Sequence, residues 1–138
     1  LLRFFTESPI TSWHAVSIKS DLEEIKDDKA TITLTFSDGS SGTIHYFANG
    51  GKVFPKERIE VFCGGAVLQL DNYRVLKGFG WPGFNRDKSL RQDKGQKDCI
   101  KAFIEAIRDG KESPIPYNEL IEVSRISIKV AESLSQSL

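Results

Sequence analysis

Hydrophobic and polar residues alternate most strictly at residues 30–36, which read Ala-Thr-Ile-Thr-Leu-Thr-Phe. Successive side chains of a β-strand point to opposite faces of the sheet, so the four apolar residues share one face and the three threonines share the other. The period of two and the β-branched residues predict a strand with one buried face.

Five further segments resemble strands and are separated by turns rich in glycine, asparagine and aspartate. They are residues 13–19, 43–47, 58–63, 66–70 and 73–77. Short turns favour antiparallel pairing, so we predict an open, mostly antiparallel sheet of about six strands. For Ile44 to share the face of Leu34, the loop between their strands must have an odd number of residues, because a slip of one residue inverts the faces.

Helical periodicity replaces this alternation after Gly95. In the segment 96–109 the apolar residues recur at the spacing of one helix face, and a second amphipathic helix is predicted at 117–135. Residues 1–6 have the pattern of the last turns of another helix. Strands followed by helices predict an α+β fold in which both C-terminal helices pack on one face of the sheet.

Composition narrows the classes of function. The 138 residues are expected to form one domain, and 19 basic residues balance 19 acidic ones. This balance argues against a nucleic-acid partner or a polybasic membrane anchor. No apolar run approaches the roughly 18 residues of a membrane span. The two cysteines have no paired spacing, so we expect a reducing, cytoplasmic location.

The sequence contains few of the residue patterns that carry chemistry. The four residues with the side chains of zinc ligands lie on different segments, without ligand spacing, and are expected to be ordinary sheet and core residues: His14, His45, Cys63 and Cys99. The glycine patterns of dinucleotide and phosphate sites and the serine elbow of hydrolases are absent. We therefore predict no catalytic, cofactor-binding or metal residue in this chain.

The segment 78–94 interleaves aromatic and charged residues. With Lys77 it carries five cations against two carboxylates. Aromatic rings beside cations can hold an anionic ligand, but the same residues can also be a structural crossover that covers the end of the core. Both interpretations remain open on the sequence.

Two observations concern the extent of the chain. It contains no methionine and opens in the middle of an apolar helical pattern. We therefore expect it to be a piece of a longer polypeptide.

Residues 42–62 form a recognisable string, Gly-Thr-Ile-His-Tyr-Phe-Ala-Asn-Gly-Gly-Lys-Val-Phe-Pro-Lys-Glu-Arg-Ile-Glu-Val-Phe. Together with Gln-Asp-Lys-Gly at 92–95, Ala-Phe-Ile-Glu-Ala-Ile at 102–107 and Pro-Ile-Pro at 114–116, it resembles the C-terminal domain of the Gfo/Idh/MocA oxidoreductases. These are the relatives of glucose–fructose oxidoreductase and inositol dehydrogenase. The similarity covers nearly the whole chain and is greatest to the branch that acts on nucleotide-linked or modified sugars.

The resemblance implies a two-domain enzyme whose N-terminal Rossmann domain binds NAD or NADP. The catalytic lysine and histidine of that family lie in motifs that precede the Leu-Leu-Arg-Phe helix, so neither is in this chain. Gln96 stands where relatives commonly have histidine, so no role is carried over at that position. The implied function is the substrate-binding and dimerisation domain of an NAD(P)-dependent sugar dehydrogenase, inactive without the Rossmann domain. The alternative is a non-catalytic assembly or ligand-binding module that uses an open sheet face.

Two groups of residues follow from these interpretations. Residues flanking loops at the sheet ends are expected near an anionic sugar: Lys56, Arg58, Trp81 and Lys94. The polar sheet face is expected to pair with itself in a homodimer, through Thr31, Thr33, Thr35, Thr43 and His45. A plain solvated face explains the threonines equally well, and the resemblance favours the dimer.

Overall fold

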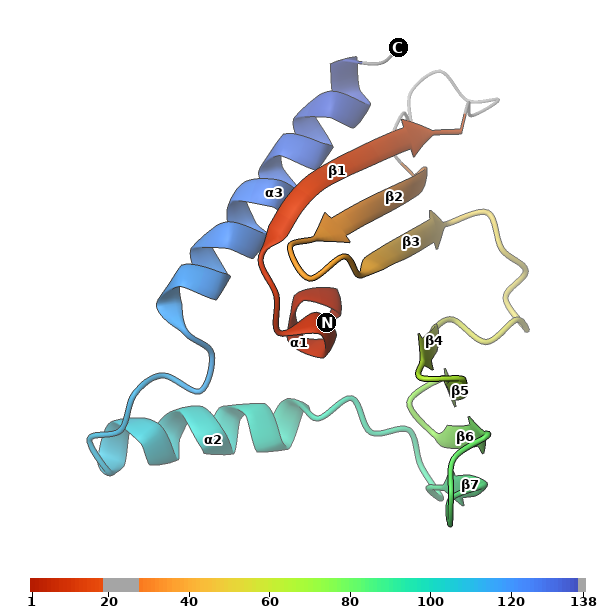
Figure 1. Ribbon diagram of the computed structural model, residues 1–138, viewed down its shortest axis with the longest axis vertical. Coiled ribbons are helices and arrows are strands. Elements are labelled where there is room, and N and C mark those ends of the chain that lie inside the picture. The colour runs from red at the N-terminus through yellow and green to blue at the C-terminus, as the bar shows by residue number, and fades with distance from the viewer. Residues whose placement is uncertain (19–27, 137–138) are drawn as a thin grey trace. The chain divides into compact units, whose positions relative to one another are not determined.

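The computed structural model describes residues 1–18 and 28–136 of the chain (Figure 1). The chain forms two compact units, of which one comprises Leu1–Gly50 with Lys111–Leu138 and the other Gly51–Gly110. Each unit has an antiparallel sheet and helical structure, which makes this an α+β fold, as predicted. The two units are described separately below.

The first unit contains a three-stranded sheet in the order β1-β2-β3. Its elements are α1 (Leu2–Thr6), β1 (Ile10–Ser17), β2 (Lys29–Phe36), β3 (Ser41–Phe47) and α3 (Tyr117–Gln136). β1 and β2 overlap the predicted segments, although residue 19 of the first prediction lies outside the described residues. Both neighbouring pairs are antiparallel, as predicted.

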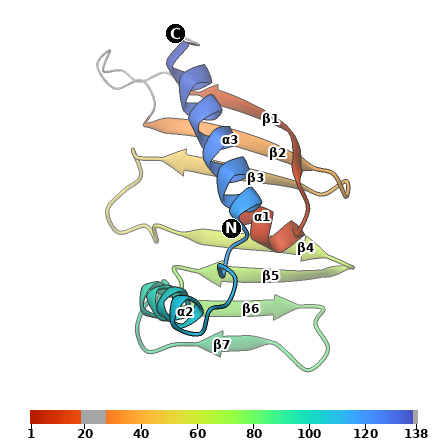
Figure 2. The ribbon, with the colours of Figure 1, turned by 90° about the vertical axis from the view of Figure 1, so that its left-hand side faces the viewer.

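The core of this unit lies where α3 crosses one face of the sheet (Figure 2). Its most buried members are Ala30, Val130 and Leu134, and partly buried apolar residues pack around them: Trp13, Ala15, Ile32 and Ile126. Full burial of a leucine or valine side chain stabilises a fold by roughly 1.5–3 kcal/mol. The alternation of β2 therefore selects which face α3 covers.

The hairpin of β2 and β3 has the predicted register. Ile32 pairs with Ile44 and Leu34 with Gly42, so the apolar residues of both strands share the covered face. Thr35 and Ser41 are the last pair before the loop, and residues 36–40 between them are odd in number. Gly39 completes the reversal with a φ of 86°, a left-handed conformation that glycine adopts without strain.

A buried ion pair connects α1 and α3. Arg3 is only 9% exposed, and its guanidinium contacts Glu119 at 3.3 Å and Glu122 at 3.1 Å. The other carboxylate oxygen of Glu122 accepts a hydrogen bond from the backbone N–H of Ile10. One carboxylate of α3 thereby fixes both the first helix and the start of β1.

The second unit contains a four-stranded antiparallel sheet in the order β4-β5-β6-β7, together with α2. The bounds are β4 (Arg58–Cys63), β5 (Ala66–Asp71), β6 (Val75–Phe79), β7 (Arg86–Lys88) and α2 (Gln96–Arg108). Gly64 and Gly65 join β4 to β5 with φ values of 56° and 81°, the tight reversal preferred in two-residue hairpins.

The segment 78–94 is more ordered than its composition indicates. Its residues Arg86–Lys88 form β7, a strand that the sequence did not predict. The ring of Phe84 lies so close over Gly78 that an added Cβ would come within 2.6 Å of it. Part of the segment is therefore a packed end of the sheet, which supports the structural interpretation for these residues.

The structure corrects the expected arrangement of the helices. Residues 1–18 and 28–136 contain seven strands in two sheets, and of their two long helices only α3 contributes to the core of the first unit. Four apolar side chains of α2 are more than half exposed, namely Ile100, Phe103, Ile104 and Ile107. Three strands about 4.8 Å apart span about 10 Å, close to the diameter of one helix, so the sheet of the first unit has room for one long helix, α3, with the short α1 beside it over Gly42.

Candidate functional site

The uncovered face of the β1–β3 sheet carries a continuous set of small polar side chains. The register places Thr31 opposite His45 and Thr33 opposite both Thr43 and His14. The hydroxyl of Thr31 lies 3.1 Å from Nδ1 of His45, and the hydroxyls of Thr33 and Thr43 are 3.4 Å apart. The five residues predicted for a dimer face therefore share one surface, which we call the threonine face.

The threonine face is opposite the side that α3 covers, because the core residues Ala30 and Ile32 alternate with its threonines along β2. The ring of His45 stacks on that of Phe47, with centroids 5.5 Å apart, and this contact fixes the imidazole at one edge. Hydroxyl and imidazole groups both donate and accept hydrogen bonds, so a second polar surface can pair with this face without burying an unpaired charge. His14 was not assigned to this surface from the sequence. It follows the apolar Trp13 in the strand, and this alternation would have placed it on the polar face.

One end of the β4–β7 sheet carries a network of charged residues centred on Asp71. Its carboxylate accepts hydrogen bonds from Arg58 at 2.9 Å, from Gln69 at 2.8 Å and from Lys77 at 3.1 Å. Burial tends to raise the pKa of Asp71, but the hydrogen bonds from Lys77, Gln69 and Arg58 outweigh it and leave the pKa below its ordinary value. Asp71 is therefore an ionised residue that holds three neighbours in place.

A second ion pair lies near this end of the sheet. Lys94 pairs with Glu57, and its ammonium lies 5.8 Å from the centre of the Tyr73 ring, within cation–π range. Asn72 and Tyr73 both have left-handed backbone, with φ values of 53° and 49°. For a tyrosine this conformation is uncommon, so surrounding contacts must hold the turn. The backbone bonds from Asn72 to Glu57 and from Asp93 to Tyr73 do so.

The predicted sugar-contacting residues are only partly brought together. Arg58 and Lys94 lie at the same end of the β4–β7 sheet through their partners Asp71 and Glu57, and the exposed Lys56 precedes them. Trp81 follows β6 and lies at the opposite end, because Val67 pairs with Phe79 there. Three of the four residues therefore form one basic end of the sheet, and Trp81 is separate from it.

The remaining candidate ligands do not gather. Cys63 and Cys99 are both exposed and unbonded. Within residues 1–18 and 28–136, no three side chains of the metal-binding types come close enough to hold an ion. In the same part of the chain, no helix is at once long enough and apolar enough to cross a membrane.

Comparisons of this chain with protein-family models, with curated proteins and with solved structures each found no match.

Proposed function

We propose that this chain is the substrate-binding and assembly part of an NAD(P)-dependent oxidoreductase acting on a sugar. The Rossmann domain and the catalytic residues would belong to another part of the same polypeptide. The observation that carries the proposal is the threonine face, a polar sheet surface on the side opposite α3. The resemblance of residues 42–62 and 92–95 to Gfo/Idh/MocA enzymes supports the oxidoreductase activity.

The threonine face has the chemistry of a self-complementary interface. In a two-fold dimer the same patch lies on both protomers, so each side chain must tolerate a copy of its neighbours. Thr31, Thr33 and Thr43 carry no charge, and their hydroxyls can exchange internal hydrogen bonds for bonds to the partner. Such a face pairs without like-charge repulsion.

The test of assembly is Thr33→Glu at the centre of this face. Wild-type protein should sediment as a dimer, and Thr33→Glu should be mainly monomeric, because two carboxylates would be buried near the symmetry axis. Ser124→Glu on an exposed position of α3 is the matched control and should remain dimeric. Circular dichroism of both variants establishes that the fold is retained. A wild-type chain that stays monomeric at hundreds of micromolar would refute assembly through this face.

The alternative is a non-catalytic assembly or binding module built on the same surface. The two functions differ in what the complete polypeptide does. Incubating it with NAD or NADP and a panel of free and nucleotide-linked sugars should give reduced cofactor if it is a dehydrogenase. The coding sequence before Leu1 should then contain a strand followed by a glycine-rich phosphate loop. Absence of both would favour the binding module, whatever the oligomeric state.

A further inference from the structure

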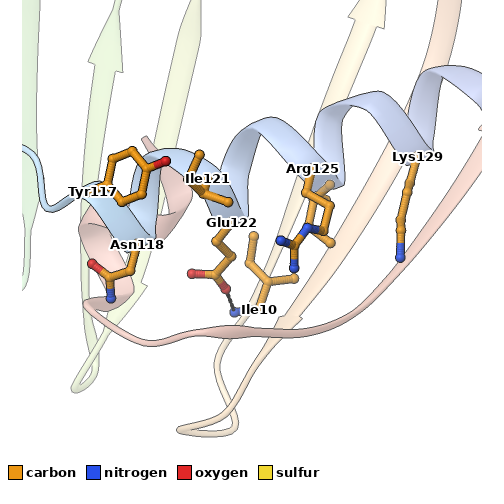
Figure 3. Close-up of a pocket in the computed structure, with 8 residues that line it drawn as sticks. Ile10, Tyr117, Asn118, Ile121, Glu122, Arg125 and Lys129 are labelled. Atoms are coloured by element: carbon orange, nitrogen blue, oxygen red, sulfur yellow. Dashed lines mark hydrogen bonds between the residues drawn. The ribbon is translucent and has the colours of Figure 1, made fainter.

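A groove of about 550 Å³ runs between α3 and the beginning of β1 (Figure 3). Its volume is within the range of about 300–1,000 Å³ that is typical of ligand sites in proteins. One portion is apolar and another is polar or charged. The lining residues are Ile10, Tyr117, Asn118, Ile121, Glu122, Arg125, Ile126 and Lys129.

The charge of the groove is positive. Glu122 is already engaged by Arg3 and by the backbone of Ile10. Arg125 and Lys129 are one helical turn apart, and Figure 3 shows both side chains leaving α3 on the side where Glu122 meets Ile10. Neither cation has an ion-pair partner among residues 1–18 and 28–136. Two cations one turn apart repel each other, and a carboxylate ligand would relieve that repulsion.

The groove also adjoins a sheet edge with which no other strand of the described residues pairs. β1 is an outer strand, and the N–H of Ile18 donates to Lys29 on the β2 side. Backbone groups of a strand alternate in direction, so those of Trp13 and Ala15 point away from β2. The side chains of Trp13 and Ala15 pack toward α3. An added strand would therefore find hydrogen-bond partners on β1 and a helix surface beside it.

We propose that this groove binds an extended acidic peptide segment of another protein as an additional strand on β1. The peptide backbone pairs with the outer edge at Trp13 and Ala15. Two of its carboxylates meet Arg125 and Lys129, and its apolar side chains contact the isoleucines at the other end of the groove. An edge strand beside a helix groove is a recurrent mode of peptide recognition, in which the backbone bonds supply affinity and the groove supplies specificity.

The charge of the groove distinguishes this occupant from a second copy of the chain. Antiparallel pairing of two β1 strands would also use the free edge. However, Ile10–Ser17 reads Ile-Thr-Ser-Trp-His-Ala-Val-Ser and contains no carboxylate. A second β1 would leave Arg125 and Lys129 without counter-charges. A partner with glutamate or aspartate at alternate positions satisfies both the edge and the cations.

The probe is a fluorescein-labelled octapeptide, Val-Thr-Val-Thr-Glu-Thr-Glu-Thr, tested in both sequence orders against the full chain by anisotropy. On a strand its valines and glutamates share one face, as the groove requires. We expect saturable binding for at least one order. The double variant Arg125→Gln/Lys129→Gln should weaken it about tenfold, the effect of losing two partly exposed charge contacts. The matched control Lys97→Gln/Lys101→Gln, on α2, removes equal charge and should bind as the wild type does.

A proline version of the peptide separates strand pairing from simple charge attraction. Replacing the adjacent third and fourth residues by proline removes one backbone donor from each edge of the peptide strand and keeps both carboxylates, so binding should be lost in either pairing sense. Equal binding of the proline peptide, or equal weakening by the control on α2, would show general anion attraction and overturn the proposal. No saturable binding of either order would overturn it as well. Slower hydrogen exchange at the amides of Trp13 and Ala15 in the complex is the expected structural signature.

Discussion

Asp71 shows how a single carboxylate organises one end of the β4–β7 sheet. Its three side-chain donors come from β4, β5 and β6, so the network crosses three strands. The Asp71 side chain is 19% exposed, whereas those of Arg58 and Lys77 are 53% and 37% exposed. Solvent screens the outer parts of the network, so its contribution to stability is modest.

The change Asp71→Asn should lower the free energy of unfolding by about 1 kcal/mol, because an amide offers one acceptor oxygen to donors that now face two. Asp87→Asn, at an exposed position of β7, is the control and should have little effect. The chain has two tryptophans, of which Trp81 belongs to the second unit. In a Trp13→Phe background, the fluorescence of Trp81 during denaturant titration therefore reports on the unfolding of this unit. Equal stability of both variants would show that the network contributes nothing measurable.

The same carboxylate gives a pH dependence of defined sign. The pKa of Asp71 is lowered in the folded protein from its ordinary value of 3.8, so folding favours the ionised form. Its stabilising contribution is complete above that value and is lost as the pH falls through the lowered pKa of the folded state. The difference in stability between wild type and Asp71→Asn should therefore shrink on acidification below pH 3.8. A difference that stays constant down to the acid transition would contradict this.

Lys94 is the residue whose substitution most directly tests a sugar site at the basic end of this sheet. In the full-length protein, Lys94→Gln should raise KM for an anionic sugar roughly five- to tenfold with kcat unchanged, as expected for losing one charge-assisted contact. The neutral replacement avoids placing two carboxylates together beside Glu57. Lys97→Gln, an exposed neighbour on α2, should leave KM unchanged. Unaltered KM in Lys94→Gln would assign the residue a structural role in its ion pair.

At the scale of elements, the attachment of α3 to the rest of its unit depends on Glu122. This residue contacts Arg3 of α1 and Ile10 of β1. Glu122→Ala should lower the free energy of unfolding by about 2–3 kcal/mol, because Nε of the buried Arg3 and the backbone N–H of Ile10 lose their acceptor while only Glu119 still pairs with Arg3. Glu132→Ala on the exposed side of the same helix should cost far less. Fluorescence of Trp13 in a Trp81→Phe background measures both, and equal losses would refute the special position of Glu122.

The elements themselves were largely predictable because their patterns are local. The strand at 30–36 and the helices at 96–109 and 117–135 were confirmed within one or two residues at each end. Alternation and helical periodicity record which side chains one element buries, and this information lies within the element. β7 was not predicted because Arg86–Lys88 is charged throughout and becomes a strand only by pairing with β6.

Which elements pack against each other was harder to predict from the sequence. The apolar stripe of α2 predicts that the helix needs a partner surface but does not specify which one. The sequence therefore assigned α2 to the face that α3 covers, whereas the isoleucines of α2 remain exposed. The amphipathic pattern shows that one face of the helix favours burial, and tertiary packing determines which surface covers that face.

At the scale of the whole molecule, the candidate surfaces differ in how far the sequence revealed them. The threonine face follows from the alternation of β2 and the register of its hairpin with β3, and its five residues were predicted together. Trp81 and Lys94 lie in the same basic, aromatic segment of the sequence, so the sequence predicted that they would be close together. The direction of β6 places Trp81 at the other end of the sheet. The groove beside α3 was not anticipated, because Ile10 and Lys129 are brought together only by folding.

The chain alone should not bind NAD(H) or NADP(H). It lacks the glycine pattern that brings a pyrophosphate to the N-terminus of a helix. Isothermal titration of each cofactor form into the chain should show only heats of dilution. Saturable binding at micromolar cofactor would contradict the proposal that another part of the polypeptide binds the cofactor. The complete polypeptide, titrated in parallel, is the positive control and should bind one of the two cofactors.

The odd loop between β2 and β3 constrains how this protein can vary. If one residue were inserted between Thr35 and Ser41 and the five-residue loop were kept, β3 would shift by one residue, which would place His45 beneath the helix and Ile44 among the threonines. The hydrophobic pattern opposes that shift, so a longer loop or a bulge absorbs the extra residue at small cost. Insertions and deletions in this hairpin should therefore be confined to the loop residues 36–40, so that the pairing of Ile32 with Ile44 rather than the length of the loop is what selection preserves.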